Sequence, residues 1–399
     1  MELDNIKLRH LEPYYNIKVS LTLTKYIGTW PPVLEPYRSI YLLYTCISFI
    51  FILGIYLTVQ TVNLFVIWGN IELMIATAFL LMTNSIHAYK VFVILGNQKR
   101  IQVLLDKLST TNYYHNDDKY ERVFTYYAWL GLYHHIAYQS FGTVAVLCWG
   151  LTPLADAVAG NTRRLPMEAW YPYNTKKSPA FEITSGHQAV AVIIACFHNI
   201  GMDTLVTGLI NAACCQLEII KQNLKNVDLD FEHNSIDKCD YEDFMNKEIN
   251  KIIKHSNEIY NFIKEIEDIF GLIILFQLTV NCLIICITAF HITKMTVFIP
   301  TEFFGMMVYL CCMTYQIFIY CYHGNELAIQ SASIGSAAFA SNWWKFHKNY
   351  NRSLGLLITR FNRSIVFTAG PLMRLSLQLF MSILRMSYSF FTLLQSSTK

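Results

Sequence analysis

Residues 39–65 read SIYLLYTCISFIFILGIYLTVQTVNLF, and none of these side chains is charged. A helix rises about 1.5 Å per residue, so this stretch is long enough to cross a hydrocarbon core about 30 Å thick. Backbone polar groups in lipid must bond one another, which favours a helix. Six further apolar stretches follow at 71–95, 124–152, 187–217, 270–294, 298–322 and 371–397. The chain is therefore predicted to be one all-α domain over residues 1–399, with seven transmembrane helices.

The composition supports this class. Of the 399 residues, 54% are hydrophobic and 15% are charged. Soluble domains average roughly 45–50% apolar and about 25% charged residues, so an ordinary soluble domain is excluded. The apolar stretches lack the alternation of period two that a membrane β-barrel needs. The predicted surroundings are membrane lipid, and no nucleic-acid partner is expected.

Basic residues gather in alternate loops. One set of loops, at 1–38, 96–122, 221–258 and 323–374, holds 5, 5, 6 and 6 Lys or Arg residues, 22 in total. The opposite set, at 66–70, 153–186 and 294–297, holds 0, 4 and 1, a total of 5. Short loops rich in Lys and Arg stay in the cytosol. This predicts a cytosolic N-terminal segment at 1–38, an extracellular C-terminus, and the reverse of the orientation of a G-protein-coupled receptor.

Two stretches outside the predicted spans have helical periodicity. Residues 241–269 are charged, yet isoleucine and phenylalanine recur at steps of three and four, which indicates an amphipathic helix leading into the fifth span. Residues 346–367 show a similar pattern. We predict a cytosolic anchor region of two helices that pack on each other and on neighbouring subunits.

The last predicted span carries one polar line. Gly370 and Pro371 are expected to end the second anchor helix and to start this span. The line consists of Gln378, Ser382, Arg385, Ser389, Thr392 and Ser396. Their spacing of four and three places all six on one helix face. Two interpretations are open: the hydroxyls bond their own backbone and allow close packing, or they border a water-filled path. Because one helix cannot enclose a path, the second needs several copies of the chain.

The sequence shows no enzyme chemistry. It has no P-loop, GxSxG, HExxH or paired CxxC motif, so neither an enzyme nor a cofactor or metal site is predicted. Asp203 and His87 stand within predicted spans and could touch a ligand, although a hydrogen-bonded buried group is the simpler interpretation.

Several motifs, in order along nearly the whole chain, resemble the insect odorant receptor family. They are Leu165-Pro166 with Ala169–Pro172, Met202–Leu205 with Gln216–Ile220, His255–Phe270 with Ile273–Cys286, Tyr322–Leu327, and the closing segment Ser382–Leu394. The family's inverted topology agrees with the cytosolic N-terminus predicted from charge. The resemblance implies a subunit of a tetrameric, odorant-gated, non-selective cation channel at the plasma membrane of olfactory neuron dendrites.

The resemblance also implies partners and sites. The short segment 221–258 is typical of a tuning subunit, which combines with a shared co-receptor subunit. The last helix would line the pore for cations, and the pore-lining positions would be Ser389, Thr392, Leu393, Ser396 and Ser397. The apolar pocket for a small volatile ligand would use Ala76, Phe79, Leu80, Gly142, Ala145, Trp149, Val190, Ile194, Tyr309 and Cys312.

Three other functions were weighed. A gustatory receptor shares the topology and the channel mechanism, but the Trp170-Tyr171-Pro172 motif and the last helix favour the odorant branch. A secondary transporter predicts inverted repeats and broken helices, and neither is apparent in the sequence. A membrane enzyme lacks its catalytic residues.

Overall fold

The computed structural model describes residues 11–31, 35–69, 71–109, 120–158, 160, 164–167, 169–233, 241–295, 300–345, 348–361 and 364–397. The helices are α1 (Tyr15–Ile27), α2 (Glu35–Phe49), the π-helical turn η2 (Ile50–Gly54), α3 (Ile55–Val66), α4 (Ile71–Gly96), α5 (Gln98–Leu108), α6 (Glu121–Gly150), α7 (Thr152–Val158), α8 (Ala180–His233), α9 (Tyr241–Lys294), α10 (Pro300–Phe339), η4 (Trp343–Lys345), α11 (Lys348–Phe361) and α12 (Leu377–Ser397). One two-stranded hairpin, β1 (Thr368–Ala369) with β2 (Met373–Arg374), precedes α12.

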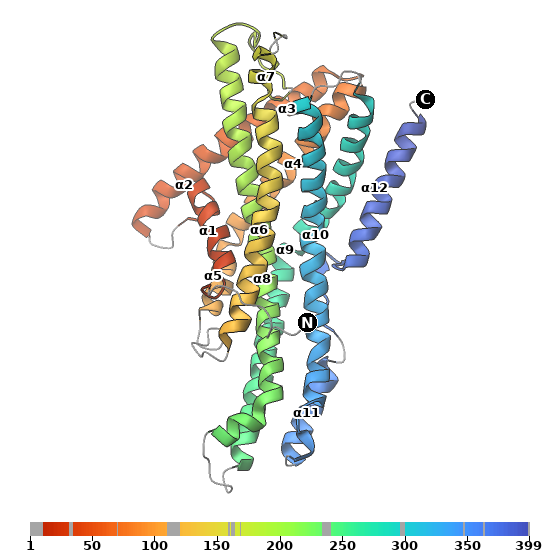
Figure 1. Ribbon diagram of the computed structural model, residues 1–399. Coiled ribbons are helices and arrows are strands. Elements are labelled where there is room, and N and C mark those ends of the chain that lie inside the picture. Colours follow the sequence, from red (N-terminus) through yellow and green to blue (C-terminus); the bar gives the residue numbers. More distant parts are fainter. Residues whose placement is uncertain are drawn as a thin grey trace.

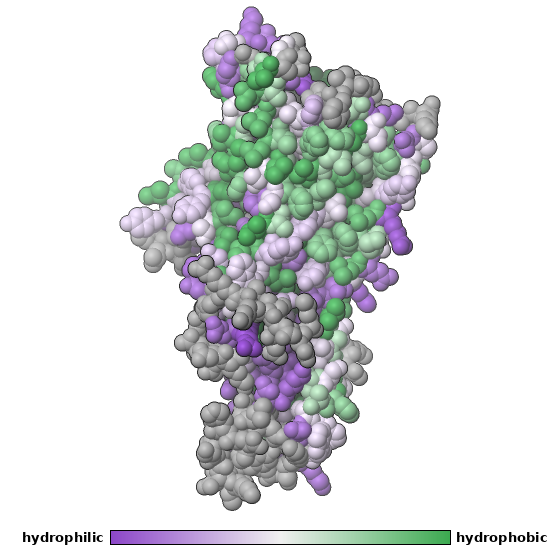
Figure 2. Space-filling view, viewed as in Figure 1, coloured by the Kyte–Doolittle hydropathy of each residue, from purple (hydrophilic) through white to green (hydrophobic). Residues whose placement is uncertain are grey.

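The helices form an elongated bundle with α7 at one end and α11 at the other (Figure 1). Six helical segments in the described part of the chain are long and apolar enough to cross a membrane. The pair α6 and α7, bent by 43°, raises the number to seven if it is one span. Figure 2 shows hydrophobic residues concentrated on the half that carries α7, and hydrophilic residues towards the α11 end. The predicted all-α class with about seven spans is confirmed.

The core lies where α6, α8 and α10 pack against one another. Their contact faces carry fully buried apolar side chains, among them Leu205, Leu209 and Ile317. Helices α9 and α10 continue well beyond the predicted spans, so the predicted end of the sixth span at 322 is extended to Phe339. The predicted amphipathic stretch 241–269 is continuous with the fifth span inside α9.

The N-terminal segment contains a helix that the sequence analysis did not identify. Helix α1 packs on α8 and α6, and it buries Asn16, Ser20 and Thr24. Gly131 on α6 and Gly208 on α8 make room for it, because a Cβ at Gly131 would lie 2.3 Å from the Asn16 amide nitrogen. Because these buried side chains are polar, the sequence of α1 lacks the apolar periodicity that would predict an amphipathic helix.

The start predicted for the last span, residue 371, is wrong. Gly370 takes a positive φ of 58°, which glycine adopts without strain, and Pro371 follows it in the turn of the hairpin. The Leu375 amide donates to the Phe367 carbonyl at 2.9 Å, and the helix starts at Leu377. The anchor helix predicted at 346–367 is also shorter, since α11 ends at Phe361.

Candidate functional site

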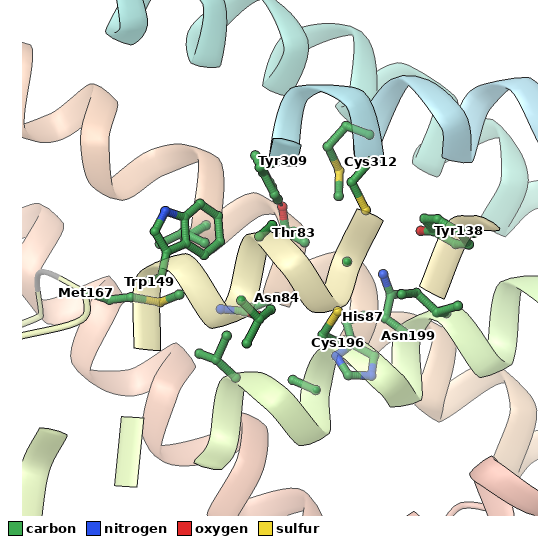
Figure 3. A pocket seen from close by; sticks show the side chains of 18 residues that line it. Thr83, Asn84, His87, Tyr138, Trp149, Met167, Cys196, Asn199, Tyr309 and Cys312 are labelled. Carbon is green, nitrogen blue, oxygen red and sulfur yellow. Dashed lines mark hydrogen bonds between the residues drawn. The ribbon is translucent and has the colours of Figure 1, made fainter. Parts of the chain in front are cut away.

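A cavity of about 80 Å³ lies where α4, α6, α8 and α10 meet, as Figure 3 shows. Met167, from the connection between α7 and α8, closes one side. The lining consists of Leu80, Thr83, Asn84, His87, Tyr138, Gly142, Ala145, Val146, Trp149, Met167, Val192, Ala195, Cys196, Asn199, Ile200, Tyr309, Cys312 and Met313. Most of these side chains are apolar, which suits a small apolar ligand.

Three aromatic rings pack against one another, tilted by 48–56°, at one wall of the cavity. The centroid of Trp149 lies 5.1 Å from that of Tyr309, and Phe79 stands 5.5 Å from Tyr309 behind the lining. The Tyr309 hydroxyl contacts the Thr83 hydroxyl at 2.7 Å, and Thr83 donates to the Phe79 carbonyl. Trp149 and Tyr309, fixed in this way, give the cavity an aromatic wall against which a ligand can pack by dispersion.

Gly142 creates part of the empty volume. A Cβ at this position would lie 2.6 Å from the Ile200 Cδ1 atom and 2.7 Å from the Cys196 Sγ atom. Any larger residue would therefore displace side chains or fill the cavity. Ala145, one turn further along α6, is another small residue on the same wall.

The opposite side of the cavity is polar, and we call His87, Tyr138 and Asn199 the polar floor. All three are at least nine-tenths buried. Tyr138 donates to the Asp203 carboxylate at 3.2 Å, and the Asn199 carbonyl oxygen accepts from the Lys90 ammonium at 2.9 Å. Two of the three floor residues, Tyr138 and Asn199, are therefore held by hydrogen bonds to Asp203 and Lys90.

Lys90 and Asp203 form an ion pair in the interior of the bundle, with side-chain exposures of 3% and 1%. Asp203 also accepts from the Tyr320 hydroxyl at 2.7 Å and from Gln316. Burying two charges is costly, and such a pair is stable only when further hydrogen bonds satisfy both groups. The pairing confirms that Asp203 is a hydrogen-bonded buried group, whereas His87 also borders the cavity.

Gln316 extends these polar contacts towards α12. Its side-chain oxygen accepts from Asn281 at 2.8 Å and from Gln277 at 3.1 Å, both on α9. One residue beyond Asn281, the Cys282 carbonyl accepts from the Ser387 hydroxyl of α12 at 3.1 Å. A continuous set of contacts thus joins the polar floor to the last helix.

The structure brings six of the ten predicted pocket residues into the lining. These are Leu80, Gly142, Ala145, Trp149, Tyr309 and Cys312. Phe79 packs behind them, Ile194 is half-buried outside the lining, and Val190 is 49% exposed. The side chain of Ala76 lies outside the described residues.

Sequence reasoning missed the face that α8 turns to the cavity. Val192, Ala195, Cys196 and Asn199 line it, at helical steps of three, one and three. The predicted positions Val190 and Ile194 lie on neighbouring faces of this helix. Ala195, Cys196 and Asn199 are small or polar and share one helix face. This pattern in the sequence could have predicted the face, because a cavity needs small side chains on its wall.

A larger cavity of about 420 Å³ lies on the α7 side and shares Leu80, Trp149 and Met167 with the first. Arg164 borders this outer cavity and pairs with Asp156 at 3.0 Å and Glu302 at 3.3 Å. The hydrogen bonds that Arg164 donates to the Asp156 carboxylate raise the pKa of Arg164, so this guanidinium stays charged. The shared side chains separate the polar outer cavity from the apolar inner one.

The polar line of α12 is exposed on this chain. Ser382, Ser389, Thr392 and Ser396 bond carbonyls of their own helix and face away from the bundle. Leu393 is 65% exposed, and the side chain of Ser397 lies outside the described residues. Only 11% of the most apolar window of α12 is buried, so most of its surface is open to lipid, water or another subunit.

An all-α membrane protein with an apolar cavity and a polar floor inside the bundle has the architecture of a small-molecule receptor. The model of the 7tm odorant receptor family matches residues 70–388, and the chain belongs to this family. It is therefore a member of a family of receptors rather than of enzymes.

Individual relatives agree with the family assignment. The chain is 27% identical to odorant receptor Or1 of Anopheles gambiae, over 95% of this chain and 94% of the relative. It is 24% identical to odorant receptor 46a, isoform A, of Drosophila melanogaster, over 79% and 81%. The fold is similar to that of the olfactory receptor OR5 of Machilis hrabei in complex with eugenol, with a TM-score of 0.82, 17% identity and coverage of 96% and 97%.

Proposed function

We propose that this chain is the odorant-binding subunit of an odorant-gated, non-selective cation channel in the plasma membrane of olfactory neuron dendrites. The main support is the apolar cavity, whose polar floor is hydrogen-bonded through Asp203 and Gln316 to Asn281 of α9. The next residue of α9, Cys282, accepts a hydrogen bond from Ser387 of α12, the helix with the exposed polar line. A structural neighbour that binds eugenol supports an odorant ligand. In this proposal the N-terminus is cytosolic, the C-terminus is extracellular, and the cavity lies in the outer half of the membrane.

The cavity is smaller than the ligand that it is proposed to bind. Its volume of about 80 Å³ lies below the roughly 150 Å³ of an engineered cavity that accepts benzene. A volatile molecule of that size must therefore displace flexible neighbours such as Met167, Met313 and Cys196, all of which line the cavity. A ligand that fits only the displaced arrangement shifts the population towards it.

The displaced arrangement is proposed to open the pore. Gln316 contacts both Asp203 next to the polar floor and Asn281 of α9, so movement of α10 is transmitted to the helix that holds α12. The polar line of α12 then borders the ion path together with the same helix of the other subunits. Four subunits, including a co-receptor, would enclose this path, because one helix cannot do so.

Whole-cell current during exposure to a panel of volatile compounds tests this function. Cells express the chain with or without a co-receptor, and G-protein signalling is blocked. The proposal predicts a fast cation current that a volatile compound evokes. If the chain reaches the cell surface and no volatile compound evokes current, the channel proposal fails.

Gly142→Ala is expected to raise the concentration for half-maximal current by about 5- to 150-fold. The new methyl group occupies space 2.6–2.7 Å from atoms of Ile200 and Cys196, so it fills part of the cavity. Overpacking costs about 1–3 kcal/mol, and about 1.4 kcal/mol is a factor of ten.

The matched control is Gly150→Ala on the same helix. Its Cβ meets only Ala189 Cβ, at an ordinary 3.9 Å, so we expect an unchanged response. Equal responses of the two variants would place the ligand elsewhere in the protein.

A further inference from the structure

The polar floor contains a hydrogen-bond donor that no described residue uses. Asn199 is 9% exposed and lines the cavity. Its carbonyl oxygen must face Lys90, because an ammonium only donates. The amide nitrogen is therefore turned away from Lys90. Figure 3 shows it pointing away from α8, towards the side that carries Cys312. Because Asn199 lines the cavity, a ligand acceptor there can bond this donor.

An acceptor stands beside this donor. His87 is one helical turn before Lys90, and its Nε2 atom lies 3.1 Å from the Nδ1 atom of His198. The Nε2 atom of His198 lies 2.6 Å from the Thr29 hydroxyl, which also contacts the Thr24 carbonyl at 3.2 Å. This chain of contacts begins at a carbonyl, and a carbonyl can only accept.

One direction of the protons gives a proton to all three contacts in this chain. Thr29 donates to Thr24, so the Thr29 oxygen accepts from the Nε2–H of His198. The Nδ1 atom of His198 then accepts from the Nε2–H of His87. A neutral imidazole carries one N–H, so the Nδ1 atom of His87 is left as an acceptor. In the opposite direction Thr29 donates to the Nε2 atom of His198, and the Nδ1 atom of His87 carries a proton. The Thr24 carbonyl then accepts only from the backbone N–H groups of Gly28 and Thr29.

We propose that the polar floor binds the hydroxyl group of a small alcohol or phenol. Asn199 donates to the hydroxyl oxygen, and His87 accepts its proton. The carbon skeleton lies against Trp149 and Tyr309 on the aromatic wall. This inference rests on the proposed function and names the chemical class of its ligand. Hydrocarbons of the same shape leave both polar groups unpaired, and ketones offer no proton to His87.

The melting temperature of the purified full-length protein gives apparent dissociation constants without any need for channel activity. The probes are cyclohexanol with methylcyclohexane and cyclohexanone, and phenol with toluene. We expect at least one hydroxyl compound to bind about tenfold more tightly than its hydrocarbon partner, and more tightly than the ketone where one is tested. Hydrocarbons that bind as tightly as the hydroxyl compounds overturn the proposal. A ketone that equals the alcohol overturns the role of His87.

Asn199→Asp is the matching variant, because it keeps the oxygen that Lys90 needs and replaces the amide donor with a second carboxylate oxygen. It also adds a negative charge beside Lys90, so each affinity is compared within this variant, between the hydroxyl compound and its hydrocarbon partner. We expect the tenfold preference for the hydroxyl compound to disappear. Val192→Ala, on the apolar wall, changes only the space for the carbon skeleton, so it should change the affinity for both members of each pair by the same factor. A preference that survives Asn199→Asp contradicts the assignment. Hydroxyl-selective binding without any evoked current would leave this inference intact while the channel function fails.

Discussion

Replacing Asp203 with leucine is expected to destabilise the purified receptor by about 3–5 kcal/mol and to remove it from the cell surface. The substitution leaves the ammonium of Lys90 buried, at 3% exposure, and among the described residues only the neutral Asn199 amide still accepts from it. Removing one partner of a buried ion pair costs this much because the other charge stays uncompensated. Tyr320 and Tyr138 also lose the carboxylate to which they donate.

The double variant Lys90→Met with Asp203→Leu tests the reason for this loss. Both charges are then absent, and we expect most of the stability to return, as it does when apolar residues of similar volume replace a buried pair. Thermal unfolding of the single and double variants in detergent measures the difference. Lys90→Met alone is measured as well. If the double variant loses as much stability as Lys90→Met and Asp203→Leu together, charge pairing does not stabilise this part of the bundle.

Gly324→Ala is expected to have the second-largest effect, because it forces the hairpin away from α10. A Cβ at Gly324 would lie 2.3 Å from the Leu375 Cβ atom and 3.2 Å from the Leu375 carbonyl oxygen. Neither atom is the end of a flexible side chain, so the backbone itself must move. Overpacking of this kind costs about 1–3 kcal/mol. Leu375 lies just before α12, so we also expect loss of evoked current at normal surface levels.

Gly335→Ala is the matched control on the same helix. No atom lies within 4 Å of its new Cβ. Alanine favours a helix over glycine by about 1 kcal/mol, so this variant should be neutral or slightly more stable. Surface labelling and current are measured on both variants. Equal behaviour of the two would show that the contact between α10 and the hairpin does not position α12.

Much of the fold could be predicted because the bilayer imposes a simple rule. Stretches such as 39–65 lack charge and must be helical in lipid, and the structure places α2, η2 and α3 there as one span. Helix α1 could not be predicted in this way. Its buried face carries Asn16, Ser20 and Thr24 instead of an apolar stripe, and the Ser20 and Thr24 hydroxyls bond Thr204 of α8 or carbonyls of α1.

The cavity was only partly predictable from the sequence. The aromatic wall and the small residues of α6 follow from their spacing and from the family resemblance. The polar floor could not be predicted, because the residues that bond it are far apart in the chain. Lys90 and Asp203 are separated by 113 residues. Lys90 within an apolar stretch was a sign of a buried partner, since an unpaired charge in the membrane is costly. Which acceptor it meets depends on the packing of α4 on α8.

The most direct test of the central claim is cysteine modification of α12 in cells that also express a co-receptor. The variant Ser396→Cys places a thiol on the exposed polar line, and Phe390→Cys places one on a different exposed face of the same helix. Wild-type protein, with its own cysteines, sets the baseline. The account predicts that a charged, membrane-impermeant thiol reagent blocks the volatile-evoked current of Ser396→Cys, while wild type and Phe390→Cys keep theirs. An evoked current in Ser396→Cys that the reagent leaves unchanged would contradict a pore lined by the polar face of α12.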